Sequence, residues 1–201
     1  MEMVQGEGGV NVLDKAFVDG VAALCKEKDI LFLADEVQTG NGRTGKLYAY
    51  MNYNVQPDVV STAKGIGGGL PLGVTMMGEK TEFTLTSGSH GSTFGGNPVC
   101  CAGAVSILER LDDALFDAVK QKGAYIKKEL EGCKGVKGVS GMGLILGVAT
   151  EKDASKVAHD CLDQGVIVMT AKDKLRLLPA LNIPDEQLVK AVQIIKGVIE
   201  A

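Results

Sequence analysis

The chain has 201 residues, enough for one domain with a core or for one domain and a smaller second one. Its hydrophobic content of 45% and charged content of 23% are ordinary for a soluble globular protein. The formal net charge of −4 argues against nucleic acid as the main partner, because phosphate binding needs a basic surface. No apolar run approaches the roughly 20 residues of a membrane helix, and no secretion signal is visible at the N-terminus.

The five cysteines include the adjacent pair Cys100 and Cys101 but no Cys-x-x-Cys motif. A zinc knuckle or a thioredoxin-like site is therefore not supported. The apolar neighbours of Cys100 and Cys101 predict that both are small buried hydrophobic residues. Two histidines are too few and too scattered for a metal site. We expect a cytoplasmic protein with reduced thiols and no bound metal.

In the first half of the chain, helix-like and strand-like patterns alternate. Apolar spacing predicts a helix over residues 14–28 and a strand over 30–34. A glycine-rich loop covers residues 38–45, a second strand ends just before Lys64, and a third is expected over 72–77. Strands joined by helices and long crossovers favour an α/β unit with a mostly parallel sheet and functional loops at its carboxyl edge.

In the second half, the pattern changes to that of a small α+β domain. Asn97 and Pro98 form a helix-start signal, and helices are expected to about residue 110 and over 115–130. Further strands are predicted over 136–140, 144–149, 166–170 and 174–178, and further helices over 154–164 and 185–199. We expect residues 1–104 in the larger α/β domain and residues 105–201 in the small one. The glycine-rich first nine residues indicate that the chain begins in mid-architecture.

Two residues with useful chemistry stand at predicted strand ends. Lys64 closes the apolar run over residues 57–63 and precedes a glycine-rich turn, so its amine is expected at the end of a buried strand. Asp35 ends the strand before it. A lysine amine can bind an aldehyde cofactor, and a carboxylate can hold a pyridinium nitrogen. By itself Lys64 would be read as an ordinary surface lysine, but with Asp35 it indicates pyridoxal phosphate chemistry.

Three other patterns leave alternatives open. Asp35 and Glu36 after an apolar strand also fit a P-loop ATPase, although the chain has no Gly-x-x-x-x-Gly-Lys-Ser/Thr motif. The loop over residues 87–97, which contains His90, either offers amides and hydroxyls to a phosphate or is a plain surface loop. Arg176 lies among apolar neighbours, either on the exposed face of an edge strand or as a buried guanidinium that needs a carboxylate.

Together these motifs resemble the class III (subgroup II) pyridoxal-phosphate aminotransferases, and within them the acetylornithine aminotransferases. The likeness follows the family's order through residues 5–10, 34–45, 61–73, 88–98 and 175–182. Several independent motifs in this order make the resemblance specific. It implies part of the large α/β domain of the fold type I pyridoxal-phosphate transferases, followed by a small α+β C-terminal domain.

The resemblance implies how the cofactor, pyridoxal 5'-phosphate, would be bound. Lys64 would hold its aldehyde as an imine and then move the proton during the transfer. Asp35 would keep the pyridine nitrogen protonated, so that the ring can draw off electrons. Gln38 would contact the phenolic oxygen. Thr93 would bind the phosphate, which in this family belongs to the site of the neighbouring subunit of a homodimer.

The resemblance also implies the substrates. Arg176 would clamp the α-carboxylate of glutamate or 2-oxoglutarate, and Glu7 would pair with Arg176 when no such carboxylate is bound. The implied reaction is the transfer of an amino group from N-acetylornithine to 2-oxoglutarate in arginine biosynthesis. Enzymes that act on ornithine, succinylornithine or 4-aminobutyrate share most of these residues, so the donor stays open.

The sequence also departs from the family pattern. Family chains are about twice as long, and the glycine- and serine-rich phosphate loop and the aromatic that stacks on the ring belong to the half not present here. Met3 stands where the family usually has proline. The chain therefore reads as a C-terminal fragment. We expect little or no activity from it alone, and the alternative is a non-catalytic fragment that folds and self-associates.

Overall fold

In the computed structural model, which describes residues 1–201, the chain forms two compact units. The first unit contains residues 1–3, 13–42 and 46–112, and the second contains 4–12, 43–45 and 113–201. Two short segments from the first half of the sequence thus belong to the second unit. The assignment of residues 1–104 and 105–201 to two domains remains a prediction.

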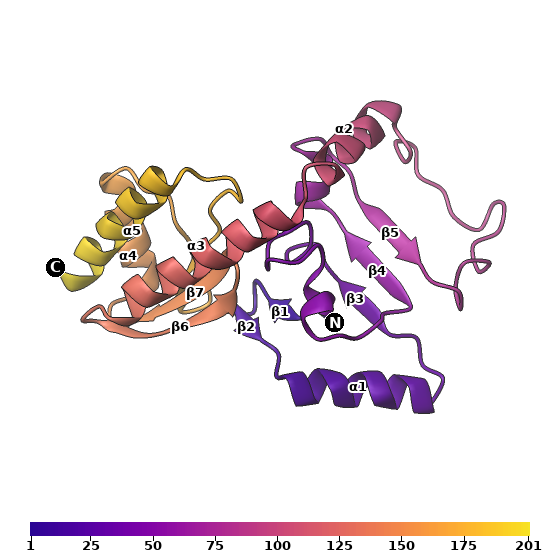
Figure 1. Ribbon diagram of the computed structural model, residues 1–201, viewed down its shortest axis with the longest axis horizontal. Coiled ribbons are helices and arrows are strands. Elements are labelled where there is room, and N and C mark those ends of the chain that lie inside the picture. Colours follow the sequence, from indigo (N-terminus) through magenta and orange to yellow (C-terminus); the bar gives the residue numbers. More distant parts are fainter. The chain divides into compact units, whose positions relative to one another are not determined.

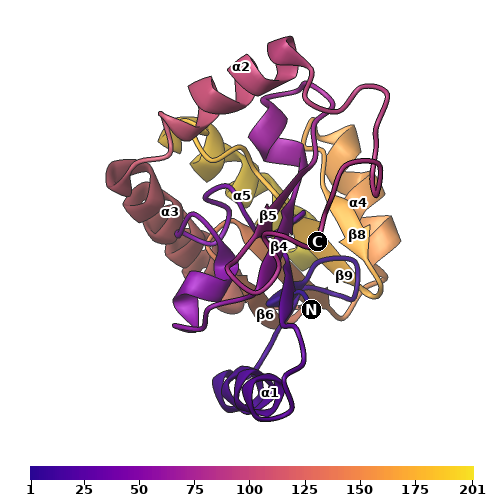
Figure 2. The ribbon, with the colours of Figure 1, turned by 90° about the vertical axis from the view of Figure 1, so that its right-hand side faces the viewer.

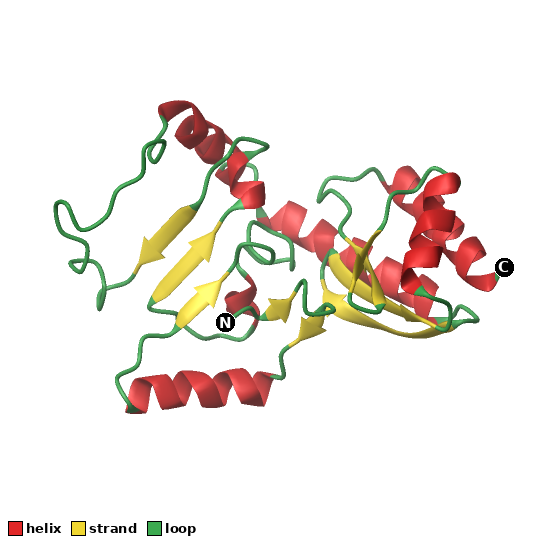
Figure 3. Cartoon of the chain, turned by 180° about the vertical axis from the view of Figure 1, so that it is seen from behind, coloured by secondary structure: helices red, strands yellow, loops and turns green.

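The first unit is built on a three-stranded sheet in the order β3 (Leu33–Asp35), β4 (Val59–Thr62) and β5 (Val74–Met77). β3 and β4 run parallel, with Asp35 opposite Ser61, whereas β4 and β5 run antiparallel (Figure 3). The connection from β4 to β5 covers residues 63–73 and contains a 3₁₀-helix but no crossover α-helix, which suits an antiparallel pair. The sheet is therefore mixed, and its one parallel pair carries the two predicted strand-end residues.

β3 begins three residues later than the predicted strand over residues 30–34. The backbone N–H of Phe32 donates to the Asp58 carboxylate at 2.8 Å, so the segment before Leu33 is held by a side chain. The apolar pattern that predicted the strand is present, but the sheet ladder starts only at Leu33.

Two α-helices and two 3₁₀-helices complete the first unit, and both α-helices lie where the sequence predicted them. Their bounds are α1 (Lys15–Glu27), η1 (Ala49–Asn52), η2 (Lys64–Gly67) and α2 (Pro98–Leu108). Asp14 caps α1 by accepting the N–H groups of Ala16 and Phe17 at 2.8 and 3.2 Å. Asn97 caps α2 in the same way. Figure 2 shows α1 end-on at the lower edge of its unit.

The prediction that Cys100 and Cys101 are both buried is wrong for Cys101, which is exposed, whereas Cys100 is buried. Both residues lie on α2, which packs against η2. Consecutive helical residues point about 100° apart, so the two thiols cannot both face η2.

The second unit is an antiparallel sheet in the order β6–β7–β9–β8 with three helices on one face (Figure 1). The strands are β6 (Val136–Met142), β7 (Ile145–Thr150), β8 (Met169–Ala171) and β9 (Lys174–Leu177). The helices are α3 (Asp113–Glu131), α4 (Ala154–Asp163) and α5 (Asp185–Glu200). All seven elements lie within a few residues of their predicted places.

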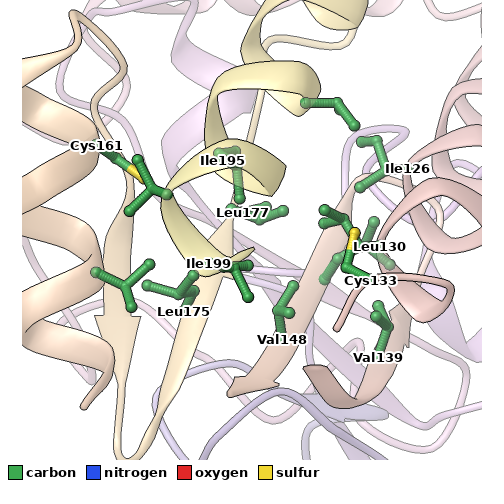
Figure 4. Packing of buried hydrophobic residues seen from close by; sticks show 14 of the residues in the cluster. Ile126, Leu130, Cys133, Val139, Val148, Cys161, Leu175, Leu177, Ile195 and Ile199 are labelled. Carbon is green, nitrogen blue, oxygen red and sulfur yellow. The ribbon is translucent and has the colours of Figure 1, made fainter. Parts of the chain in front are cut away.

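The core of the second unit lies between the helices and the sheet. Side chains of α5, such as Ile195 and Ile199, meet Val148 of β7 and Leu175 of β9 there (Figure 4). Burial of this many aliphatic side chains is the main source of the unit's stability. None of the helices combines the length and the apolar composition that a membrane span requires.

A small hairpin from the start of the chain belongs to the second unit. It consists of β1 (Val4–Gln5) and β2 (Asn11–Val12), paired antiparallel. Val4 and Val10 form a second buried cluster with Ile145 and Ala171. Ile145 lies outside the cluster that the helices cover, so the hairpin packs on the opposite face of the sheet.

Candidate active site

Asp35 and Lys64 lie at the same edge of the sheet because the strands that carry them are parallel neighbours. Asp35 is the last residue of β3, and Lys64 follows the end of β4 by two positions. Parallel strands end at the same edge of a sheet. The carboxylate and the amine therefore lie at one edge, and both side chains are exposed. We call this pair the strand-end site.

Lys64 is exposed, although the strand before it is partly buried. The backbone leaves the sheet at Ala63, and Lys64 opens η2 with a φ of 52°. This left-handed conformation costs a non-glycine residue free energy, so the surrounding structure must hold it. The turn directs the Lys64 side chain to solvent, within reach of a ligand.

Asp35 keeps one carboxylate oxygen engaged with its own turn. Its Oδ1 accepts the backbone N–H of Val37 at 3.0 Å. This bond orients the carboxylate at the strand end and leaves Oδ2 open to a donor such as a protonated ring nitrogen.

Glu36, the second acidic residue of the pair, has a structural role. Its carboxylate is fully buried and accepts the Thr39 hydroxyl at 2.5 Å and the N–H groups of Ala49 and Tyr50 at 2.9 Å each. Burial raises the pKa of Glu36, and these three hydrogen bonds lower it in part. Hydrogen-bond donors of the protein enclose the Glu36 carboxylate. Glu36 is therefore not available as the second acidic residue that the P-loop ATPase alternative requires.

Gln38 and Thr93 are placed by loops. Gln38 is half-buried in the turn that follows β3, three residues after Asp35. Thr93 is exposed in the loop between β5 and α2, as is His90. The roles predicted for Gln38 and Thr93 in cofactor binding remain predictions.

In the second unit, Arg176 is a buried guanidinium, and the edge-strand alternative is wrong. β9 pairs with β7 on one side and β8 on the other, so it is an inner strand. Successive strand residues face opposite sides of a sheet. Leu175 and Leu177 face the helical core, and Arg176 faces the hairpin.

Glu7 supplies the carboxylate that the buried guanidinium needs. It lies in the hairpin turn between β1 and β2 and forms an ion pair with Nη1 of Arg176. The Arg176 side chain is 5% exposed, whereas that of Glu7 is 70% exposed. We call this pair the arginine site.

Gly147 lets the hairpin approach Arg176. It lies directly opposite Arg176 in the pairing of β7 with β9. A Cβ atom at Gly147 would lie 2.8 Å from Cβ of Val10 and 3.1 Å from Oγ of Ser140. Carbon atoms do not approach this closely without a shift, so a side chain here would push the hairpin away.

The sequence reasoning missed Arg43, which ties together backbone segments of the second unit. Its Nη1 donates to the carbonyl oxygens of Pro179 at 2.5 Å and Leu144 at 3.1 Å. Burial lowers the pKa of Arg43 to about 10. Pro179 follows β9, so Arg43 helps to fix the strand that carries Arg176. The signal in the sequence that could have identified Arg43 is its place as an arginine inside the glycine-rich loop over residues 38–45.

Comparison with known proteins places the chain in a family. It matches Aminotransferase class-III over residues 1–199. The chain belongs to this family. It is 46% identical over 201 residues to acetylornithine aminotransferase of Haemophilus ducreyi, covering 99% of this chain and 51% of the relative. It is 40% identical over 200 residues to acetylornithine aminotransferase of Aquifex aeolicus, covering 99% and 53%. The chain spans about half the length of the curated relatives it matches.

Solved structures confirm the predicted fold class. Ornithine delta-aminotransferase of Plasmodium falciparum matches with a TM-score of 0.90 and 37% identity, over 98% of this chain and 54% of that one. Acetylornithine aminotransferase of Elizabethkingia anophelis matches with a TM-score of 0.90 and 34% identity, over 98% and 52%. The family resemblance stated from the sequence motifs is thus confirmed.

Aminotransferases of class III depend on pyridoxal 5'-phosphate, and the strand-end site fits this group. The cofactor needs an accessible primary amine for its aldehyde and a carboxylate for its ring nitrogen. Lys64 and Asp35 supply both at one edge of the sheet, exposed and on neighbouring strands.

Proposed function

We propose that the chain carries the lysine-bearing part of a pyridoxal-phosphate-dependent aminotransferase that moves an amino group from N-acetylornithine to 2-oxoglutarate, in arginine biosynthesis. The observation that carries the proposal is the parallel pairing of β3 with β4, which brings Asp35 and Lys64 to one sheet edge. Relatives named acetylornithine aminotransferase support the choice of donor. We propose a cytoplasmic homodimer as the working form.

The strand-end site would perform the chemistry. When bound, the cofactor supplies an electron sink for the carbon that loses or gains the amino group. Nζ of Lys64 would hold the aldehyde, and the same amine would move a proton at the substrate's amine-bearing carbon. The Asp35 carboxylate would hold the ring nitrogen and favour its protonated form. Gln38 would contact the phenolic oxygen, and Thr93 would donate to the phosphate in the partner subunit's site.

The arginine site would choose between the two substrates. A buried guanidinium without a carboxylate is costly, so Glu7 pairs with Arg176 in the empty state. Because the Glu7 side chain is largely exposed, it can move into water when the α-carboxylate of glutamate or 2-oxoglutarate takes its place. N-acetylornithine also has an α-carboxylate but reacts at its terminal amine, several carbons away, so it would place no carboxylate beside the reacting carbon and would leave the pair closed. One site can thus accept two different substrates.

A second candidate donor is ornithine, since ornithine aminotransferases are among the similar solved structures. Enzymes for succinylornithine and 4-aminobutyrate remain further alternatives. A third reading is a non-catalytic polypeptide. In that reading the polypeptide folds and self-associates without catalysis.

The test is glutamate formation from 2-oxoglutarate with one amine donor at a time. The purified chain is supplied with pyridoxal phosphate and with N-acetylornithine, ornithine, succinylornithine or 4-aminobutyrate. A second series adds the N-terminal half of the Haemophilus ducreyi relative as a separate polypeptide. The matched control is Lys64→Arg, which keeps the positive charge but cannot bind the aldehyde.

We expect little or no glutamate from the chain alone. In the presence of the second polypeptide we expect N-acetylornithine to give the fastest formation, abolished by Lys64→Arg. Faster formation with ornithine would favour the second candidate. No formation with any donor would favour the non-catalytic reading.

A further inference from the structure

The turn that presents Lys64 is fastened by a buried asparagine from a different loop. Asn41 is 6% exposed, and its Nδ2 donates to the Thr62 hydroxyl at 2.9 Å and to the Ala63 carbonyl at 3.1 Å. Thr62 and Ala63 are the two residues immediately before Lys64. The amide thus bonds to the backbone at the point where it leaves the sheet.

The same carbonyl closes the turn from the other side. The oxygen of Ala63 also accepts the N–H of Ile66 at 3.3 Å, within the 3₁₀-helix that begins at Lys64. Asn41 also lies against the next peptide, because a Cβ atom at Gly65 would lie 3.5 Å from Cβ of Asn41. The asparagine is therefore bonded to the residue before Lys64 and lies near the residue after it.

Lys64 needs this support because its φ of 52° is costly for a residue with a side chain. Such a conformation persists only where neighbouring contacts determine it. An aliphatic side chain at position 41 could fill the space but could not donate to either oxygen. A buried acceptor left without its donor would favour a different turn.

The network continues toward Asp35. The Thr62 hydroxyl that accepts from Asn41 donates to the carbonyl oxygen of Glu36 at 3.5 Å, a long bond. The N–H of Glu36 in turn donates to the carbonyl oxygen of Ser61 at 2.8 Å. Asn41 thus links the end of β4 to the residue that follows Asp35.

We propose that Asn41 is a positioning residue for Lys64, holding the turn that presents the lysine amine. This inference rests on the proposed function of Lys64. Asn41 acts through the backbone of residues 62–66 and does not itself contact the reacting atoms. Its Oδ1 atom is buried without a partner in this chain, so the donating amide group carries the role.

The test compares three variants of the 201-residue chain. Asn41→Gly removes the amide but tolerates the left-handed backbone, and Asn41→Asp keeps the shape but replaces the donor with an acceptor. Asn54→Gly is the matched control, because Asn54 is an exposed asparagine with a φ of 58°, close to the 57° of Asn41.

Two measurements distinguish a positioning role of Asn41 from a general effect on folding, and test it separately from the proposed function of Lys64. The first is hydrogen exchange of the Ile66 and Gly68 amides without cofactor, both of which are bonded within the turn. The second is the rate at which pyridoxal phosphate and borohydride label Lys64, measured against Lys46 in the same molecule across neutral to alkaline pH. Lys46 is exposed and serves as the internal reference.

In Asn41→Gly and Asn41→Asp we expect the two amides to exchange about fivefold faster, as for the loss of a net hydrogen bond. We expect Lys64 labelling relative to Lys46 to fall about tenfold. Asn54→Gly should match the parent in both. Unchanged exchange, or an unchanged Lys64 to Lys46 ratio, would overturn the positioning role. A parent chain that is not labelled at Lys64 would instead count against the proposed function, while the exchange still tests Asn41.

Discussion

The buried guanidinium of Arg176 is neutralised by a carboxylate, that of Glu7, which is itself largely open to water. The sheet fixes the arginine, because β9 is paired on both sides, whereas Glu7 lies in the turn of a short hairpin. The asymmetry makes Glu7 the partner that can leave. A carboxylate ligand that replaces it restores the pairing of the buried charge.

Replacing Glu7 with glutamine should make the stability of the protein depend more strongly on a carboxylate ligand bound at the arginine site. We expect Glu7→Gln to lower the free energy of unfolding by about 1 kcal/mol, because the guanidinium loses a carboxylate that water already screens in part. Adding 2-oxoglutarate should then raise the urea midpoint more in Glu7→Gln than in the parent, since no carboxylate has to be displaced.

The control for this pair is Glu79→Gln, an exposed glutamate of the first unit. It should match the parent with and without 2-oxoglutarate. An equal shift of the midpoint in Glu7→Gln and in the parent would show that Glu7 does not compete with the ligand.

Gly147 should be required for the hairpin to reach Arg176. A methyl group there would meet Cβ of Val10 at 2.8 Å, so we expect Gly147→Ala to cost about 1–3 kcal/mol of unfolding free energy. Gly138→Ala is the matched control, because a Cβ atom at Gly138, on the neighbouring strand β6, has nothing within 4 Å. Urea denaturation measures both, and equal costs would rule out steric crowding of the hairpin.

The contribution of Glu36 to stability should fall as pH rises, which is opposite to the usual effect of a carboxyl group. Burial raises its pKa in the folded state above the ordinary value of 4.5. The folded state therefore binds this proton more tightly than the unfolded state does. Its contribution to stability is complete below the ordinary pKa and is lost as pH rises through the raised pKa.

The measurement is the unfolding free energy of the parent minus that of Glu36→Gln, followed from acidic to neutral pH. We expect this difference to fall as pH rises, because glutamine does not titrate. A difference that rises over the same interval would mean that the hydrogen bonds from Thr39, Ala49 and Tyr50 outweigh the effect of burial.

The apolar surface of α2 should promote self-association of the chain. Val99, Val105 and Leu108 are 66%, 56% and 42% exposed on this helix. We expect dimers or larger species in sedimentation velocity at micromolar concentration, shifted toward monomer by Val105→Lys. Val189→Lys, on α5, is the control and should leave the distribution unchanged. A parent that sediments as a monomer would contradict the expectation.

Much of the fold could be predicted because its signals are local. The helices follow apolar spacing and their caps, as with Asp14 and Asn97, and the strands of the second unit follow short apolar runs. Contacts between distant segments could not be read in this way. The apolar neighbours of Arg176 fit an edge strand or an inner one, and only the pairing of β8 with β9 decides.

The residues of the candidate site also divide into those with a local sequence signal and those that depend on contacts between distant segments. Asp35 and Lys64 could be predicted because both stand at the ends of apolar runs. The exposure of Lys64 could not, because it depends on the left-handed turn after Ala63. Asn41 carries no local signal at all, since its partners Thr62 and Ala63 lie more than twenty residues away.

A map of the lysines that pyridoxal phosphate labels tests most directly whether Lys64 is the residue that binds the cofactor. The purified chain is mixed with the cofactor, reduced with borohydride, digested and analysed by mass spectrometry. We expect one adduct per chain on Lys64, weakened when Asp35→Asn removes the carboxylate for the ring nitrogen. No adduct, or labels scattered over surface lysines without preference for Lys64, would contradict it.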